Sequence, residues 1–461
     1  MSWVSVLPPL VALVVVLWRK EVIVALLAAI FAGELLQQAP AWPALPLAGV
    51  ATLERTAAVF TSLDNARLFL FMLLIGGLMS LMRDSGGVAA MVNRFVRTGL
   101  ASTPRRATLM TSIVGTVVFI ESNLSVLTAG ILSRGLFDRF GLSRAKLAYI
   151  IDSTSAPVCI LILLNGWGAF VLALLGDYTF RSSAVSVLWG TVALNFYALI
   201  SLALVFYTAL TGRYHGPLAR TTARGAGPAA GEAADDIGPP PTRARYMLLP
   251  LGTLIAGMLV CMLWTGDGDI TAGSGSRSVL YATVAALLVA YLLLVVRPDF
   301  DHLRLVRISF AGMGELLPLV TIVLLSLALG ATLRDLGTGD YIAGLVGDAV
   351  PAFLLPAMLF LAGALISFST GTSWGTFAIL VPIGMPITVA LDLPPSLMLA
   401  AILGGGVFGD HCSPISDTTA VSAVASGCDL LEHVRTQMPY ALFAGALTLV
   451  MYLMAGLLLI E

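Results

Sequence analysis

The stretch Gly409-Asp410-His411-Cys412-Ser413-Pro414-Ile415-Ser416-Asp417-Thr418-Thr419 lies inside a sequence that is otherwise almost entirely apolar. It contains two carboxylates, four hydroxyl groups and a helix-breaking proline, and apolar segments run on both sides of it. An acidic side chain near the centre of a bilayer costs about 2.5–3.5 kcal/mol even on a lenient insertion scale. We therefore expect this cluster to bind something, and a small cation suits its oxygen atoms best.

The composition around this stretch indicates an all-α polytopic membrane protein. The chain is 58% hydrophobic and 11% charged, whereas an ordinary soluble domain is about 25% charged. A span needs roughly 20 mostly apolar residues, which gives about 10–13 transmembrane helices, some short enough to be broken or re-entrant. We expect a multi-pass protein of the bacterial inner membrane, in contact with lipid. The net charge of −1 argues against a nucleic-acid partner.

One polar segment divides the chain into two halves of similar length. Residues 211–245 are rich in proline, glycine and arginine, which is typical of a flexible linker, and the arginines favour the cytoplasmic side. The sequence thus predicts an N-terminal transmembrane repeat over 1–210, a cytoplasmic linker over 211–245 and a C-terminal transmembrane repeat over 246–461. Internal duplication of this kind is common among secondary transporters.

The two halves share a chemical pattern in which an aspartate and hydroxyl groups precede a proline. The first half has Asp152-Ser153-Thr154-Ser155-Ala156-Pro157, and the second has Asp410 followed by Ser413-Pro414. Proline lacks an N–H and its ring clashes with the carbonyl group four residues earlier. The pattern therefore predicts helix breaks and free carbonyl oxygens at Ser153 and Asp410. Unwound carbonyls of this kind coordinate Na⁺ or H⁺ in transporters with discontinuous helices.

A second pair of polar interruptions lies upstream in each half. The first is Glu121-Ser122-Asn123, and the second is the hydroxyl-rich run Ser367–Thr376. Gly371 and Gly375 in the second run allow local unwinding or close approach of another helix. Glu121 lies within an apolar run, where it is either an ion ligand or a structural acid bonded to a neighbouring helix.

Several of these residues have simpler interpretations. Asp417 can be the N-cap of the following helix, and Asp152 can be a helix-terminal acid that pairs with Arg144 or Lys146. His411 can titrate near neutral pH or lie at the membrane interface without a ligand role. The apolar segments that flank Asp152 and Asp410 favour burial of both acids.

The chain resembles the NhaC family of Na⁺/H⁺ antiporters, a branch of the ion transporter superfamily. Three segments carry the resemblance: 143–157, 370–377 and 409–419. It implies two inverted-topology repeats whose broken helices meet at the membrane centre, and many such transporters form homodimers. Family members commonly have paired aspartates where this chain has Glu121-Ser122-Asn123, so one acid is lengthened and the other is absent.

We therefore predict a secondary active transporter that exchanges Na⁺ for H⁺ by competitive binding at buried carboxylates. Burial disfavours a charged carboxylate, whereas a bound cation favours it, so Na⁺ and a proton would compete at Asp410 and at Asp152 in the other half. The residues expected to bind the cation or the proton are Asp152, Asp410, Asp417, Glu121, Asn123, Ser153, Thr154, Thr370, Thr372, Ser373, Ser413 and Ser416. The expected helix breaks are at Pro157, Pro414, Gly371 and Gly375.

Two other functions would use some of the same residues. An ion-coupled carrier for a small organic acid or amino acid would use the same architecture, with the anion held at half-helix N-termini. An intramembrane protease would need Asp152 and Asp410 as a dyad that shares a proton, but the hydroxyl-rich, proline-broken setting suits ion ligation. We expect no enzymatic activity and no cofactor.

Overall fold

The computed structural model describes residues 3–38, 44–87, 89–90, 102–119, 121–163, 165–176, 178–222, 242–269 and 273–460, and these residues are mostly helical, with no β-strand among them. The helices before the predicted linker are α1 (Leu7–Arg19), α2 (Val22–Gln38), α3 (Ala44–Ala58), α4 (Leu63–Asp84), α6 (Pro104–Val117), α7 (Ser122–Arg139), α8 (Arg144–Ser153), α9 (Ala156–Leu161), α10 (Gly166–Leu175), α11 (Ala184–Leu194) and α12 (Phe196–Thr211). The later helices are α13 (Gly216–Ala219), α14 (Arg245–Thr265), α15 (Gly275–Val295), α16 (His302–Asp335), α17 (Thr338–Ala349), α18 (Leu355–Thr370), α19 (Ser373–Ala390), α20 (Pro395–Cys412), α21 (Asp417–Ser426) and α22 (Leu430–Leu459).

The lengths and composition of these helices confirm the predicted membrane class. Eight described helices are long and apolar enough to cross a membrane, or nine if the bent unit of α8, α9 and α10 counts as one span. Three shorter apolar stretches, which contain α1, α2 and α11, add to them. Together these segments fall within the predicted range of passes.

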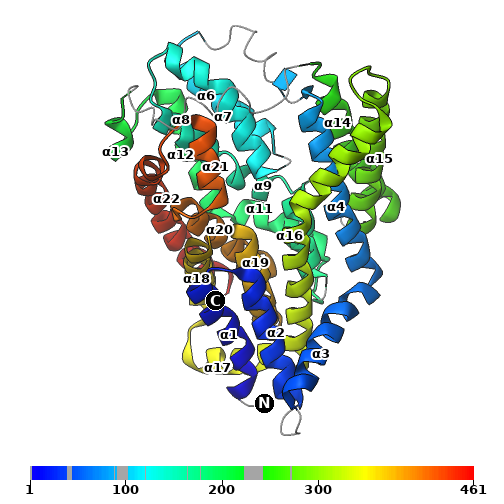
Figure 1. Cartoon of the computed structure of the whole chain (residues 1–461). Helices are drawn as coiled ribbons and strands as arrows, with labels where there is room; N and C mark the ends of the chain where they lie inside the picture. Colours follow the sequence, from blue (N-terminus) through cyan, green and yellow to red (C-terminus); the bar gives the residue numbers. More distant parts are fainter. Residues whose placement is uncertain are drawn as a thin grey trace.

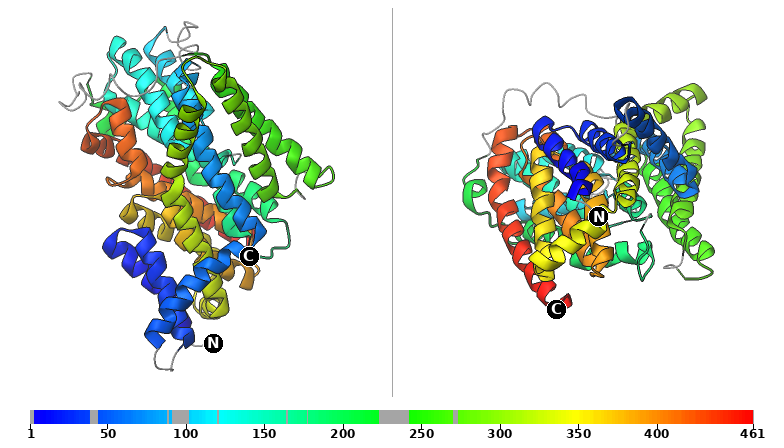
Figure 2. Two further views of the ribbon diagram at one scale, coloured as in Figure 1. Left: turned by 45° about the vertical axis from the view of Figure 1, so that its right-hand side comes forward. Right: turned by 90° about the horizontal axis from the view of Figure 1, so that it is seen from below.

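Helices α4, α14, α15 and α16 form one side of the molecule, at the right of Figure 1. Both views of Figure 2 keep α14 and α15 at the edge. Helices α4 and α16 cross through glycines, because a Cβ atom added to Gly76 would lie 2.4 Å from the Gly312 carbonyl oxygen. Small residues at such crossings let two backbones approach closely in a membrane.

Each half contains two interrupted helices in the same order. The chain breaks between α6 and α7 and between α8 and α9 in the first half, and between α18 and α19 and between α20 and α21 in the second. This is the arrangement predicted for two repeats with broken helices. Gly371 ends α18 with φ +69, a left-handed conformation that glycine adopts without a steric penalty.

Helices from the two halves pack against each other. Helix α16 contacts α2 and α4, and α21 contacts α7 and α8. Arg134 of α7 donates through Nε to the Ala425 carbonyl oxygen at 2.7 Å, and Arg144 of α8 donates to the Ser426 carbonyl oxygen at 2.7 Å. These arginines satisfy carbonyl groups left unbonded at the end of α21. Most of the predicted linker, residues 223–241, lies outside the described residues.

Candidate functional site

Asp410 lies near the end of α20 and is 1% exposed. Its Oδ2 atom accepts a hydrogen bond from Ser373 Oγ of α19 at 2.9 Å and a longer one from Thr418 Oγ1 of α21 at 3.4 Å. Its Oδ1 atom has no hydrogen-bond partner within the described part of the chain. A buried carboxylate oxygen without a partner is costly, so this atom indicates a position where a proton or a cation binds.

The backbone around Asp410 corrects one prediction from the sequence. Its carbonyl oxygen is not free, because it accepts from the Ser413 N–H at 3.0 Å and from Thr419 Oγ1 at 3.5 Å. The chain turns tightly after α20, so a local turn bond replaces the helical bond that Pro414 cannot form. Ser416, rather than Asp417, is the N-cap of α21, since its Oγ accepts from the Thr419 N–H at 3.3 Å.

Asp152, at the end of α8, is fully buried and has different partners. His433 Nε2 lies 3.2 Å from Asp152 Oδ2, and Gln437 Nε2 donates to the same oxygen at 2.6 Å. Asp152 Oδ1 has no partner among the residues that are described. The alternative pairing with Arg144 is wrong, because Arg144 pairs with Asp138.

His433 and Gln437 come from α22, and the sequence analysis missed both. Gln437 also donates to the His411 carbonyl oxygen at 3.1 Å, so one amide joins Asp152 in the first half to the backbone beside Asp410 in the second. His411 is 1% exposed and its Nδ1 lies 3.0 Å from the Tyr197 hydroxyl. It is therefore buried, and the interpretation of an interfacial histidine is wrong. The pattern that could have found His433 and Gln437 is their spacing of four residues on one helix face.

The acidic groups of the two halves lie near one another. Asp410 interacts electrostatically with both Asp417 and Asp152, and Asp417 interacts with Asp152. Neither Asp152 nor Asp410 faces bulk solvent. Both acids are therefore buried and close enough to influence each other electrostatically.

The other predicted oxygen ligands divide into those near Asp410 and those engaged elsewhere. Ser373 contacts Asp410 directly, and Ser416 also hydrogen-bonds Asp410. The remaining hydroxyls bond to backbone groups or lie in the helix breaks: Thr154 to the Ile150 carbonyl, Thr370 to the Ile366 carbonyl, Ser413 to the Phe368 carbonyl, Thr372 as the N-cap of α19, and Ser153 buried at the end of α8.

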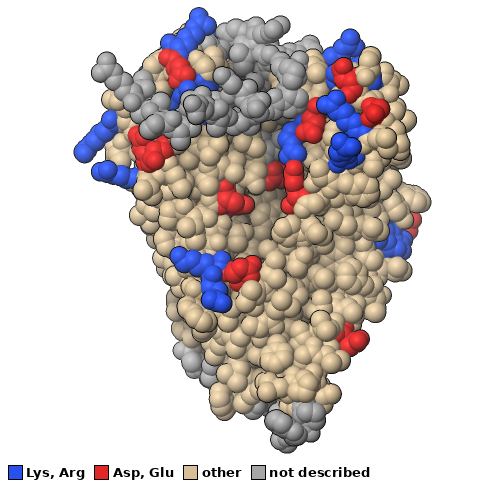
Figure 3. Space-filling model, in the orientation of Figure 1, with Lys and Arg blue, Asp and Glu red and all other residues tan. Residues whose placement is uncertain are grey.

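Glu121, Asn123 and Asp417 line a cavity of about 220 Å³ between α4, α16 and the helix breaks. Glu121 Oε1 accepts from the Asn123 N–H at 2.9 Å, at the beginning of α7. The Asn123 side chain hydrogen-bonds Asp417. Figure 3 shows a hollow near the middle of one face, with several acidic side chains beside it.

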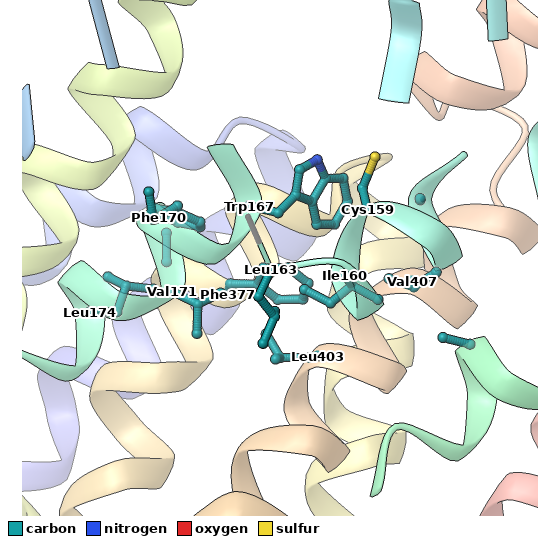
Figure 4. Close-up of a cluster of buried hydrophobic side chains, with 14 of the residues drawn as sticks. Cys159, Ile160, Leu163, Trp167, Phe170, Val171, Leu174, Phe377, Leu403 and Val407 are labelled. Atoms are coloured by element: carbon teal, nitrogen blue, oxygen red, sulfur yellow. The ribbon is translucent and has the colours of Figure 1, made fainter. Parts of the chain in front are cut away.

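Asn165 fastens the two breaks of the first half to each other. Its Oδ1 caps α10 by accepting from the Trp167 N–H at 2.9 Å, and its Nδ2 donates to the carbonyl oxygens of Phe119 and Cys159 at 2.9 Å each. Figure 4 shows the apolar cluster beside this junction, where residues of α9 and α10 approach Leu403 of α20. Pro157 lies in the first turn of α9, where its missing N–H is tolerated.

Gly371 and Gly375, where helix breaks were expected, both lie in close contact with other segments. A Cβ atom added to Gly371 would lie 2.5 Å from the Ile415 carbonyl oxygen, so the breaks of α18–α19 and α20–α21 touch. A Cβ atom added to Gly375 would lie 2.4 Å from Val22 Cγ2. Gly375 is thus a packing contact with α2 inside α19, and the local break falls at Gly371.

Buried acids beside interrupted helices, inside an apolar helical bundle, are typical of ion-coupled membrane transporters. Comparison with known proteins shows which family of transporters the chain belongs to. The model of the Na⁺/H⁺ antiporter family matches residues 158–457. The chain belongs to this family, which confirms the resemblance noted from its motifs.

Individual relatives are similar in sequence, and a solved structure shares the fold. An uncharacterized protein of Haemophilus influenzae is 30% identical over 98% of this chain and 90% of its own length. The Na⁺/H⁺ antiporter NhaC of Alkalihalophilus pseudofirmus is 33% identical over 20% of each chain. The malate-2H⁺/Na⁺-lactate antiporter of Bacillus subtilis is 32% identical over 29% of each chain. The YdaH transporter of Alcanivorax borkumensis has a similar fold, with a TM-score of 0.59 at 14% identity over 87% of both chains.

Proposed function

We propose that this antiporter exchanges Na⁺ for H⁺ across a bacterial inner membrane, and that the two ions compete at Asp410. The observation that carries the proposal is the environment of this side chain. Asp410 is buried, its Oδ2 atom is surrounded by hydroxyl groups, and its Oδ1 atom has no partner in the described residues. The carboxylate can be neutralised by a proton or by a cation, but not by both.

Hydroxyl partners suit this competition. A serine or threonine hydroxyl can donate to the ionised carboxylate, or turn its lone pairs toward a bound cation. Ser373 and Thr418 come from two different helices and both reach Asp410 Oδ2. Ser416 and Asp417 lie at the same break between α20 and α21, and they would add to a set of oxygen atoms, which Na⁺ prefers over nitrogen or sulfur.

Alternating access would follow from relative movement of the two repeats, 1–210 and 246–461, about this centre. Asp152 would then serve as the anionic counterpart of Asp410 in the other repeat. In the second repeat the two breaks are in direct contact, because Gly371 lies against the Ile415 carbonyl.

The experiment uses the purified full-length protein in liposomes that carry an imposed proton gradient and a pH-sensitive dye. Addition of Na⁺ alone should dissipate the gradient through the wild type and not through Asp410→Asn. Asp392→Asn is a matched control, because Asp392 lies at an exposed loop where it pairs with Arg181. A gradient that survives Na⁺ and collapses only when malate or lactate is also present would replace ion exchange with organic-acid exchange.

A further inference from the structure

The first turns of α22 extend beyond the apolar part of that helix. Helix α22 has 30 residues, which span about 45 Å, whereas the hydrocarbon core of a bilayer is about 30 Å thick. From Tyr440 to Leu459 the helix has no charged residue, and the part before it contains Glu432 and Arg435. The beginning of α22 therefore lies at the level of the lipid head groups, where the helix contacts α12 and α13 (Figure 1).

A polar cavity of about 360 Å³ lies at this end of α22. Its charged residues are two arginines, Arg220 after α13 and Arg435 of α22, and one glutamate, Glu432. Neither guanidinium group forms an ion pair within the part of the chain that the structure describes. Hydroxyl groups of three threonines belong to the same lining: Thr221, Thr222 and Thr436. Unpaired guanidinium groups beside hydroxyl groups are suited to bind the oxygen atoms of a phosphate group.

An apolar groove of about 410 Å³ lies next to this cavity along α22. Its lining comes from α12, α22 and the segment between α12 and α13: Leu204, Tyr207, His215, Gly216, Pro439, Tyr440 and Phe443. Gly216 of the groove directly precedes Pro217 of the cavity, and Tyr440 lies about one turn after Thr436. Tyrosine is enriched at the membrane interface, and the Phe443 side chain is 59% exposed. The groove therefore leads from the head-group level onto the lipid-facing surface of the bundle.

We propose that the cavity and the groove together bind one molecule of an anionic phospholipid, with its phosphate group between Arg220 and Arg435 and one acyl chain in the groove. A free phosphate ion would fill the cavity and leave the groove unused, so the adjoining apolar surface favours a lipid. The neighbouring linker is predicted to be cytoplasmic, and anionic lipids of that leaflet attract basic segments. The lipid site shares no residue with the acids at the helix breaks and does not depend on Na⁺/H⁺ exchange.

Native mass spectrometry of the purified full-length protein in detergent, titrated with phosphatidylglycerol or with phosphatidylcholine of the same acyl chains, tests the proposal. One phosphatidylglycerol should bind more tightly than phosphatidylcholine, whose trimethylammonium group is repelled by the arginines. The double variant Arg220→Gln/Arg435→Gln should weaken phosphatidylglycerol binding by about 25-fold, since one basic residue near an anionic lipid contributes about fivefold. Phe443→Ala should weaken the binding of both lipids, because it removes an apolar contact from the groove.

Matched controls change exposed residues of α16 that line neither the cavity nor the groove. Arg307→Gln and Phe310→Ala should bind phosphatidylglycerol as the wild type does.

Three results would each overturn the lipid site: equal affinity for the two lipids, unchanged phosphatidylglycerol binding in the double arginine variant or in Phe443→Ala, and displacement of the lipid by millimolar inorganic phosphate. The proposed function is tested separately, since Asp410→Asn should lose Na⁺/H⁺ exchange and still bind phosphatidylglycerol. Lipid binding by a wild type that does not exchange Na⁺ for H⁺ would overturn the proposed function and support the lipid site.

Discussion

Asp152 and Asp410 occupy corresponding positions in the two halves, but their surroundings differ. Asp152 is held by two nitrogen atoms from α22, at 3.2 Å from His433 and 2.6 Å from Gln437. The partners of the Asp410 carboxylate among the described residues are hydroxyl groups, from Ser373, Thr418 and Ser416. The halves therefore share a local sequence pattern, while the partners supplied by distant helices give each acid a different environment.

The different partners predict different roles for the two acids in ion exchange. The Gln437 amide donates to Asp152 Oδ2 and holds that oxygen in a fixed arrangement, whereas the His433 ring nitrogen beside it can donate or accept according to its tautomer. Hydroxyl groups can reverse their role when a proton or a cation arrives. We therefore expect Asp410 to be the exchanging acid and Asp152 to carry the more constant charge.

The largest expected effect comes from neutralising each acid in turn. Asp410→Asn should reduce Na⁺-driven dissipation of a proton gradient in liposomes to the level of protein-free vesicles, because no exchangeable charge remains. Asp152→Asn should retain measurable exchange, since the Asp410 carboxylate and its hydroxyl partners are unchanged. Equal loss of exchange in the two variants would contradict different roles for the two acids and would show that they act as one functional unit.

The next effect concerns stability. His433→Leu leaves the buried Asp152 carboxylate with only the Gln437 donor, and loss of a hydrogen-bond partner from a buried charged group costs about 1.5–3 kcal/mol. The detergent-solubilised variant should lose its monodisperse peak in size-exclusion chromatography at a clearly lower temperature than the wild type. His302→Leu is the matched control, because His302 forms an exposed contact with Tyr291. Similar unfolding temperatures for all three proteins would contradict a holding role for His433.

A smaller effect is expected at the hydroxyl beside Asp410. Ser373→Ala removes the 2.9 Å donor to Oδ2, and a hydrogen bond to a charged group contributes about 1.5–3 kcal/mol. The Na⁺ concentration for half-maximal exchange should rise by about tenfold or more. Ser369→Ala serves as the control, since Ser369 is partly exposed and, among the described residues, its hydroxyl donates to the Leu365 carbonyl of its own helix. An unchanged half-maximal concentration would remove Ser373 from the ligand set.

The smallest effect is expected at Pro414. The Asp410 carbonyl oxygen already accepts from the Ser413 N–H at 3.0 Å, so an alanine at position 414 has no free carbonyl to recapture. Pro414→Ala should change the apparent Na⁺ affinity by no more than about twofold, as for other substitutions that remove no specific contact. A tenfold loss in the same flux assay would show that the ring itself shapes the Asp410 environment.

The sequence predicted the interruptions of the helices better than it predicted the partners of the acids. Proline, glycine and hydroxyl residues act on the backbone within a few positions, so the breaks near Pro157, Gly371 and Pro414 follow from local chemistry. His433 pairs with Asp152 across 281 positions of the chain. No local pattern states which face of α22 will meet α8, and that contact depends on the packing of the whole bundle.

The error at the Asp410 carbonyl has a similar origin. Loss of one helical hydrogen bond predicts an unbonded acceptor only if no other donor is near, and here the turn supplies one within three residues. Buried backbone groups nearly always find such partners. The free oxygen in this region belongs to the Asp410 side chain instead, and burial of the residue was already indicated by its apolar neighbours.

The Asn165 amide sets a mechanical condition on any transport cycle. Its four hydrogen bonds run to two N–H groups at the start of α10, to the Phe119 carbonyl just after α6 and to the Cys159 carbonyl of α9, so one side chain joins these three segments. A movement that separates the α6–α7 break from the junction of α9 and α10 would therefore have to break hydrogen bonds of this one buried side chain.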